Sequence, residues 1–237
     1  MASGYHAQAL APDQEQFETL HSWIRETVPD GASVCDVGGG GHFLDFPSRL
    51  RPWAGRIVGV DPDAGVAARP WYDEAHQALL EQWAVTTSER FDLVLSVYVL
   101  EHVETPAAFL RAARSLLAPG GSMFGITPNI WHYFGLLTTV SMRLGIEERV
   151  LRRVRPDALV DAYHFPVRYR MNSLRRLSRL AGAAGFSRSS FRCIEDPGMF
   201  VTYFPARLGS FPARYSDLVH RLGRPQLFGT IVFRLDA

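Results

Sequence analysis

The sequence contains no lysine. All 25 basic residues are arginine, against 24 acidic residues, and the formal net charge is +1. A reaction through a lysine Schiff base or a lysine general base is therefore excluded. The nearly neutral total charge argues against nucleic acid and against a membrane surface as partners of the whole chain. No uncharged apolar run reaches the length of a bilayer span, so we expect no membrane-spanning helix.

Cysteine is scarce as well. Cys35 lies in an apolar stretch rich in β-branched residues, and Cys193 lies in a late apolar stretch. Two thiols so placed are typical of small core residues rather than of a disulfide framework, and we expect no bound metal. The first residues have neither a basic nor an apolar signal-peptide region, so we expect a cytoplasmic protein. The sequence leaves the oligomeric state open, a homodimer included.

The pattern of apolar residues indicates one α/β domain over residues 1–237. Apolar stretches typical of strands occur at 33–37, 56–61, 78–80 (weakly), 91–97, 122–127, 186–194 and 226–235. Helical patterns occur at 13–28, 42–50, 105–118, 172–184 and 213–222. Because strands alternate with helices in the first half, we expect a doubly wound, mainly parallel sheet. Ligands of such sheets bind beyond the carboxyl ends of the strands.

The stretch 33–44 is the strongest local signal. A short buried strand carries Asp36 near its end, and the four glycines 38–41 follow it. Glycine-rich turns between a strand and a helix let backbone N–H groups approach a nucleotide-like ligand. A second buried strand ends in Asp61, about 20 residues further on, which is the spacing of an acid that holds ribose hydroxyls. A dinucleotide-binding oxidoreductase shares this layout, but it needs a glycine where Phe43 stands.

Four segments together resemble class I S-adenosylmethionine-dependent methyltransferases, of the type that acts on small molecules. They are Val34–Gly41, Val58–Asp61, Phe91–Val103 and Leu117–Ser122, in the order and spacing of that family. The resemblance is good over residues 30–127, within a cofactor-binding core of 13–127. It implies a Rossmann-like sheet of seven strands, mostly parallel with the last strand antiparallel, whose final part lies in residues 171–237.

The resemblance also implies a cofactor and its contacts. S-adenosylmethionine would bind, and S-adenosylhomocysteine would leave as product. Asp36 and the glycine backbone would hold the methionine end, Asp61 the ribose, and the backbone at 96–98 would line the floor below the sulfonium. The implied cofactor-binding residues are Asp36, Gly38, Gly39, Gly40, Asp61, Pro62, Leu80, Ser96, Val97, Tyr98 and His102.

Two positions depart from the family pattern. His42 stands where the third glycine is expected, and Leu79 stands where an aspartate reaches the adenine amino group in relatives. Leu79 cannot accept that hydrogen bond. These departures keep open a second hypothesis, in which a protein of this fold binds the cofactor but serves as a scaffold or catalyses another reaction, such as a cyclisation.

The acceptor is expected to meet the segment 128–170, which we interpret as a helical lid inserted after the fifth strand. His132 and His164 are the candidates for a catalytic base, because histidine titrates near neutral pH. The candidate acceptor-binding residues are Asn129, Trp131, Tyr133, Tyr163, Tyr169 and Arg170. The main hypothesis is methyl transfer to O or N of a small molecule in specialised-metabolite or glycan biosynthesis.

Arginine is concentrated late in the chain. Residues 143–192 contain twelve arginines against four acidic residues. We interpret this stretch as a solvated helix face. An anionic acceptor, such as a phosphorylated or carboxylated metabolite, is the alternative that this pattern leaves open.

Overall fold

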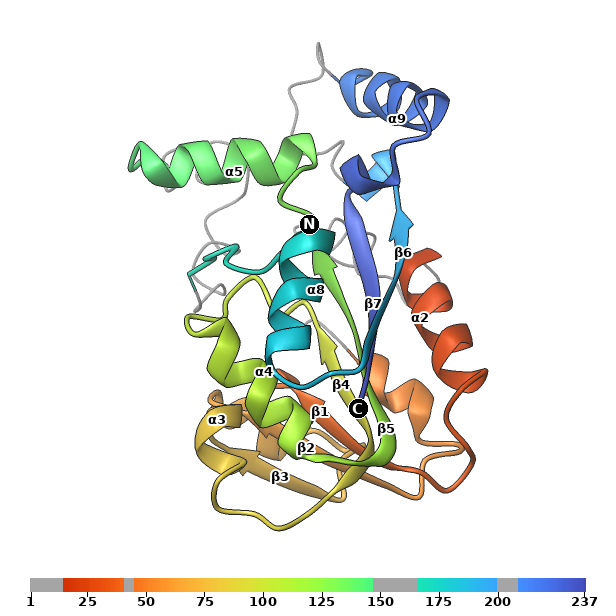
Figure 1. Cartoon of the computed structure of the whole chain (residues 1–237), viewed down its shortest axis with the longest axis vertical. Coiled ribbons are helices and arrows are strands. Elements are labelled where there is room, and N and C mark those ends of the chain that lie inside the picture. The colour runs from red at the N-terminus through yellow and green to blue at the C-terminus, as the bar shows by residue number, and fades with distance from the viewer. Residues whose placement is uncertain (1–14, 41–44, 147–165, 200–208) are drawn as a thin grey trace.

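The protein folds around a single sheet of seven strands. The computed structural model describes residues 15–40, 45–146, 166–199 and 209–237 (Figure 1). The strands are β1 (Ser33–Val37), β2 (Arg56–Asp61), β3 (Glu74–Gln77), β4 (Phe91–Val97), β5 (Leu117–Pro128), β6 (Arg188–Ile194) and β7 (Thr230–Asp236). Their order is β3-β2-β1-β4-β5-β7-β6. The first five pair in parallel, whereas β7 runs antiparallel to both β5 and β6. The predicted fold class is confirmed.

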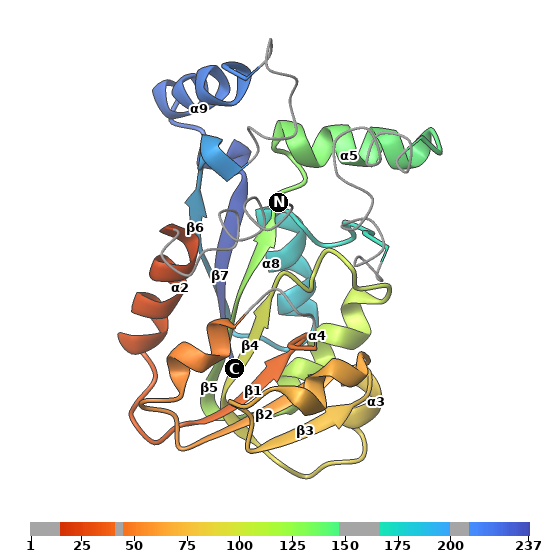
Figure 2. The ribbon, with the colours of Figure 1, turned by 180° about the vertical axis from the view of Figure 1, so that it is seen from behind.

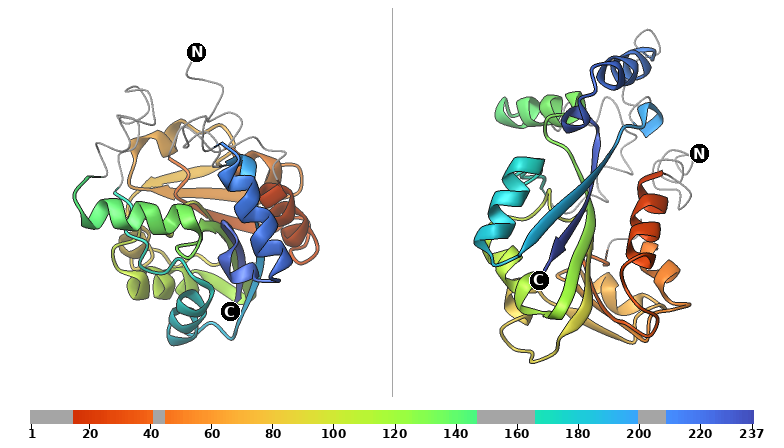
Figure 3. Two further views of the ribbon diagram at one scale, coloured as in Figure 1. Left: turned by 90° about the horizontal axis from the view of Figure 1, so that it is seen from above. Right: turned by 45° about the vertical axis from the view of Figure 1, so that its right-hand side comes forward.

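Helices cover both faces of this sheet. The α-helices are α2 (Glu15–Arg25), α3 (Leu80–Trp83), α4 (Pro106–Ser115), α5 (Tyr133–Arg143), α8 (Leu174–Ala183) and α9 (Phe211–Arg221). The 3-10 turns are η1 (Phe46–Leu50), η2 (Ala64–Ala68), η3 (Pro197–Met199) and η6 (Pro225–Leu227). Helices α4 and α8 lie on one face and α2 on the other (Figures 2 and 3). None of the helices in the described ranges is long and apolar enough to cross a membrane.

Each face of the sheet has its own apolar core. On one side Phe17, Leu20 and Ile24 of α2 pack with residues of the central strands, as their helical spacing predicts. On the other side the core includes Cys35 of β1 and residues of α3, α4 and α8. Both cysteines carry free thiols, and burial raises the pKa of Cys35 and, to about 11, that of Cys193.

The third strand differs from the prediction. The sequence pattern placed it at 78–80, but β3 is Glu74–Gln77, and Leu80 begins α3. β3 is an edge strand without a fully buried residue, so its sequence carries no apolar run for a pattern to detect. Leu80 is apolar because α3 packs against the core, not because it belongs to the sheet.

Several predicted helices begin or end elsewhere. The helix expected over 42–50 is a 3-10 turn at Phe46–Leu50, where Pro47 occupies the first turn, and residues 42–44 lie outside the described ranges. The helix expected over 105–118 is α4, which begins at Pro106, and the Thr105 side chain before it makes no capping hydrogen bond. α8 begins at Leu174 rather than at Asn172, whose side chain bonds to β5 instead.

Two helices stand beyond the carboxyl ends of the parallel strands. α5 follows β5 directly, and α9 precedes β7 (Figure 1). α5 lies within the segment 128–170 that we interpret as a helical lid, and residues 147–165 of that segment lie outside the described ranges. The carboxyl edge of the sheet is therefore the place to look for a site.

Candidate functional site

Two acidic residues mark the carboxyl edge of the sheet at the point where the strand order reverses. β1 has β2 on one side and β4 on the other, so ligands are expected where β1 ends. Asp36 and Asp61 lie at the ends of β1 and β2, and both side chains are buried. Gly38 continues β1 with a φ of +90° and donates its N–H to Val60 O at 2.9 Å. This left-handed conformation favours glycine at the start of the turn.

Asp61 is held by the backbone around it. Its Oδ2 accepts the N–H of Gly40 at 2.9 Å, and its Oδ1 accepts the N–H of Asp63 at 2.6 Å. A Cβ on Gly40 would lie 2.8 Å from the Asp61 carboxyl carbon, so the glycine permits this approach. Burial raises the pKa of Asp61, while these two backbone bonds oppose the rise. Pro62 is exposed, and its carbonyl accepts from Gln77.

Tyr72 is part of this site, although the sequence analysis did not identify it. Its hydroxyl donates a hydrogen bond to Asp36 Oδ2 across 36 positions of the chain. The tyrosine fits only because two glycines flank it. A Cβ on Gly39 would lie 1.7 Å from the Tyr72 hydroxyl, and one on Gly59 would lie 2.4 Å from its ring. Gly39 is thus required by the packing of Tyr72, whatever its role toward a ligand.

The carboxyl of Asp36 is poised to titrate near neutral pH. Burial raises its pKa from 3.8 to about 7; the hydrogen bond from Tyr72 lowers it, and the charge of Asp61 raises it further. The pKa of Tyr72 is itself raised, by burial first and then by the charge of Asp36. A cation that approached Asp36 would favour its ionised form.

The end of β4 forms the floor of this edge. Ser96 and Val97 are buried, and the Ser96 hydroxyl has no hydrogen-bond partner among the described residues. Tyr98 takes a φ of +56°, a strained conformation for a non-glycine residue, and its ring packs edge-on against Phe17. Such strain concentrates at functional sites. Leu80, a predicted cofactor contact, lies in the core as the first residue of α3.

A buried polar network adjoins the floor. The Glu101 carboxylate accepts a hydrogen bond from Thr127 Oγ1 at 3.2 Å, and Thr127 Oγ1 accepts one from Asn172 Nδ2 at 2.5 Å. Burial raises the pKa of Glu101 to about 8, which the bond from Thr127 opposes. Glu101 lies in the loop after β4, and Thr127 of β5 connects it to Asn172, which precedes α8. His102 is half-buried, with Nδ1 3.4 Å from Pro166 O.

His132 lies in a second buried cluster, beyond the end of β5. Its Nδ1 accepts the N–H of Phe134 at 3.3 Å, which leaves the proton of the neutral ring on Nε2. That Nε2 is 3.5 Å from Glu195 Oε1, and both side chains are almost fully buried. The rings of Tyr133 and Tyr215 pack on His132 at centroid distances of 4.0 and 5.0 Å. The catalytic role of His132 stays a prediction.

The other acceptor candidates are distributed around this cluster. Asn129 is buried and donates to Gln226 O and Phe228 O, so it ties β5 to the loop before β7. Trp131 is exposed, at 56%. Tyr169 takes a φ of +50°, and its N–H bonds to Glu101 O. Arg170 donates to Glu104 O, away from the cluster. Tyr163 and His164 lie outside the described residues.

The polar groups at the carboxyl edge fit S-adenosylmethionine. Each oxygen of Asp61 accepts one backbone N–H and keeps a lone pair for a ribose hydroxyl. The Asp36 carboxylate can pair with an ammonium group, and the Ser96 hydroxyl is buried beside the strand end with its hydrogen bonds unused. Within the described ranges no three His, Cys, Asp or Glu side chains gather as metal ligands would.

Comparison with known proteins agrees with this reading. The chain is 36% identical over 114 residues to a ubiquinone biosynthesis O-methyltransferase of Rhodopseudomonas palustris, covering 45% of this chain and 44% of that protein. It is 32% identical over 130 residues to the enzyme so named in Azotobacter vinelandii, covering 49% and 56%. The chain thus spans about half the length of the curated relatives it matches.

Solved structures and a family model extend the comparison to the whole fold. An S-adenosylmethionine-dependent methyltransferase from Mesorhizobium loti superposes with a TM-score of 0.58 and 16% identity, covering 95% of this chain and 99% of the other. At that identity the likeness shows the fold alone. The family model described as a methyltransferase domain matches residues 13–187. The chain belongs to this family of methyltransferase domains.

Proposed function

We propose that this protein transfers the methyl group of S-adenosylmethionine to a hydroxyl oxygen of a small molecule. The observation that carries the proposal is the pair of buried acids, Asp36 and Asp61, on the two sides of the glycine turn at the carboxyl edge. Transfer to oxygen, rather than to nitrogen, is supported by the names of the curated relatives. A role in specialised-metabolite or glycan biosynthesis is part of the proposal.

The cofactor supplies an activated methyl group, and the chain supplies position and exclusion of water. Asp61 would hold the ribose hydroxyls, and Asp36 would pair with the methionine ammonium. Because the pKa of Asp36 is about 7, the bound ammonium would keep its carboxylate ionised. Tyr72 orients that carboxylate and is therefore a positioning residue for the cofactor.

The acceptor would enter from the side of α5. The strand that ends in Thr127 leads directly to Asn129 and Trp131 and then into this helix. His132 is the proposed base for the acceptor hydroxyl: its Nδ1 would take the proton in place of the Phe134 N–H bond, and Glu195, 3.5 Å from Nε2, would stabilise the resulting imidazolium. Since the His132 ring is buried in this structure, deprotonation of an acceptor requires its aromatic neighbours to move.

The first experiment is calorimetric titration of the protein with S-adenosylmethionine and S-adenosylhomocysteine, comparing Asp61→Asn with Asp92→Asn. Both acids accept backbone N–H bonds, but Asp92 bonds Ser33 at the opposite edge of the sheet. Saturable binding that is lost only in Asp61→Asn is the expected result. Equal loss in both variants, or no heat from the folded wild type, would contradict the cofactor assignment.

The second experiment tests the transfer itself. The protein is incubated with S-adenosylmethionine and a panel of phenols, catechols and sugars, and products are analysed by mass spectrometry for a gained methyl group on oxygen. Cofactor that binds and is never consumed would favour the scaffold hypothesis. Leu79 is consistent with that second hypothesis, because it is exposed and offers no acceptor to an adenine.

A further inference from the structure

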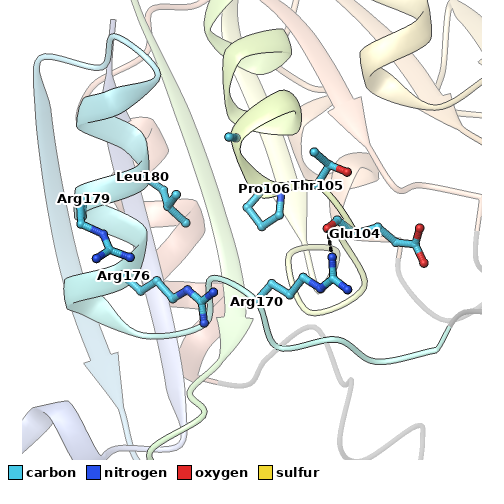
Figure 4. Close-up of a pocket in the computed structure, with 8 residues that line it drawn as sticks. Glu104, Thr105, Pro106, Arg170, Arg176, Arg179 and Leu180 are labelled. Carbon is cyan, nitrogen blue, oxygen red and sulfur yellow. Dashed lines mark hydrogen bonds between the residues drawn. The ribbon is translucent and has the colours of Figure 1, made fainter.

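A cavity of about 380 Å³ lies between the start of α4 and α8, on the outer side of the loop that follows β4 (Figure 4). Its volume is within the range of about 300–1,000 Å³ that small-molecule sites have. Its lining includes Glu104, Thr105, Pro106, Arg170, Arg176 and Arg179. None of the proposed cofactor contacts lines it, and Arg170 is the one candidate acceptor-binding residue in its lining.

Two arginines of this cavity have no acidic partner among the residues that the structure describes. Arg176 and Arg179 form no ion pair or hydrogen bond with any described residue. The one acid in the lining is Glu104, whose carboxylate pairs with Arg168 at 2.8 Å. Arg170 donates a hydrogen bond to the Glu104 carbonyl oxygen. Three arginines therefore line one space with a single carboxylate, and Figure 4 shows Arg176 and Arg179 extending from α8 while Arg170 extends toward Glu104.

The start of α4 adds to the positive electrostatic potential in the cavity. α4 is a ten-residue helix, its first residue is Pro106, and the Thr105 side chain makes no capping bond. The positive end of the helix dipole therefore faces the cavity without a side-chain acceptor. A guanidinium group binds phosphate oxygens with two parallel N–H bonds, so Arg176 and Arg179 together suit a phosphate dianion with three free oxygens better than a carboxylate with two.

We propose that this arginine cavity binds the phosphate group of a ligand. The position of the arginines distinguishes this from a merely solvated helix face. All three arginines of α8 are exposed, but only Arg176 and Arg179 line the cavity, and Arg175 does not. A solvated face would use all three arginines of α8 alike, whereas a phosphate site would use Arg176 and Arg179 and not Arg175.

The test is calorimetric titration of the full chain with inorganic phosphate and with ribose 5-phosphate, at constant ionic strength. We expect saturable binding that weakens at least tenfold in the double variant Arg176→Gln/Arg179→Gln and is unchanged in Arg175→Gln. Circular dichroism melting of each variant verifies that it is folded. No saturable binding, or the same loss in Arg175→Gln, would overturn the proposal, and this outcome does not depend on methyl transfer.

A vesicle sedimentation assay distinguishes a lipid headgroup from a small phosphorylated molecule as the source of the phosphate. Vesicles of phosphatidylglycerol and phosphatidylcholine are compared with vesicles of phosphatidylcholine alone. Sedimentation that requires Arg176 and Arg179 and is competed by ribose 5-phosphate identifies a lipid headgroup as a ligand of the cavity. Binding of the soluble phosphates without sedimentation identifies a small phosphorylated molecule. Sedimentation that Arg175→Gln reduces equally is diffuse attraction and contradicts the site.

Discussion

Asp36 makes the folded protein lose stability as the pH rises. Its pKa is 3.8 in an ordinary environment and about 7 in the fold, chiefly because the side chain is buried. A carboxyl whose folded pKa is raised contributes its full stability below about pH 4, and this contribution is lost as the pH rises to about 7. The difference between these two pKa values corresponds to roughly 4 kcal/mol of unfolding free energy, at about 1.36 kcal/mol per pKa unit.

The variant Asp36→Asn removes this titration and keeps the shape of the side chain. Between about pH 5 and pH 8 we expect the difference in unfolding free energy between wild type and variant to change by about 3 kcal/mol, in favour of the variant at the higher pH. Urea denaturation at the two pH values measures it. Glu101 also titrates from a raised pKa, but it is present in both proteins, so its contribution cancels in the difference.

The matched control is Asp73→Asn. The hydrogen bond from Arg51 holds the pKa of this exposed carboxyl below its usual value, so its stabilisation is lost as the pH falls. Between about pH 5 and pH 8 this carboxylate is ionised in both the folded and the unfolded protein, so the difference between Asp73→Asn and wild type should be the same at the two pH values. If Asp36→Asn changes the unfolding free energy equally at both pH values, the Asp36 carboxyl does not titrate in this window and the reasoning is refuted.

Three further predictions use the same denaturation assay. Tyr72→Phe removes the bond that lowers the Asp36 pKa, so its destabilisation should grow as the pH rises from about 5 to 8, and a constant difference would contradict this. Gly59→Ala places a Cβ 2.4 Å from the Tyr72 ring and should cost about 1–3 kcal/mol, whereas Gly182→Ala, with open space around it, should cost nothing. Thr127→Val removes a donor and an acceptor from a buried network and should cost about 1–3 kcal/mol; an unchanged urea midpoint would show that the network contributes nothing.

The sequence determined the fold and the location of the site. Strands β1, β2 and β4 are central and buried on both faces, so they appear in the sequence as apolar runs that a local pattern can identify. Asp36 and Asp61 interrupt those runs at their ends, which places both acids at one edge of any parallel sheet. These features depend on short segments of chain, and short segments are what hydrophobic periodicity describes.

Only the tertiary structure decided which side chains meet at that edge. Tyr72 comes from an irregular stretch. Its contact with Asp36 exists because Gly39 and Gly59 leave room for the tyrosine side chain. His132 and Glu195 form a buried pair although 63 positions separate them. β3 escaped the pattern because an edge strand is half-exposed and has no apolar run.

The arginine-rich stretch 143–192 also separates what the sequence determines from what the tertiary structure determines. Composition established that arginines outnumber acids late in the chain, but it could not say which of them share a space. The packing of α8 beside the start of α4 sets Arg176 and Arg179 at a cavity with Arg170 and leaves Arg175 outside it. A charge pattern reports how much charge a segment carries. Whether that charge can act on one ligand depends on helix packing, which is determined by apolar contacts between residues distant in the sequence.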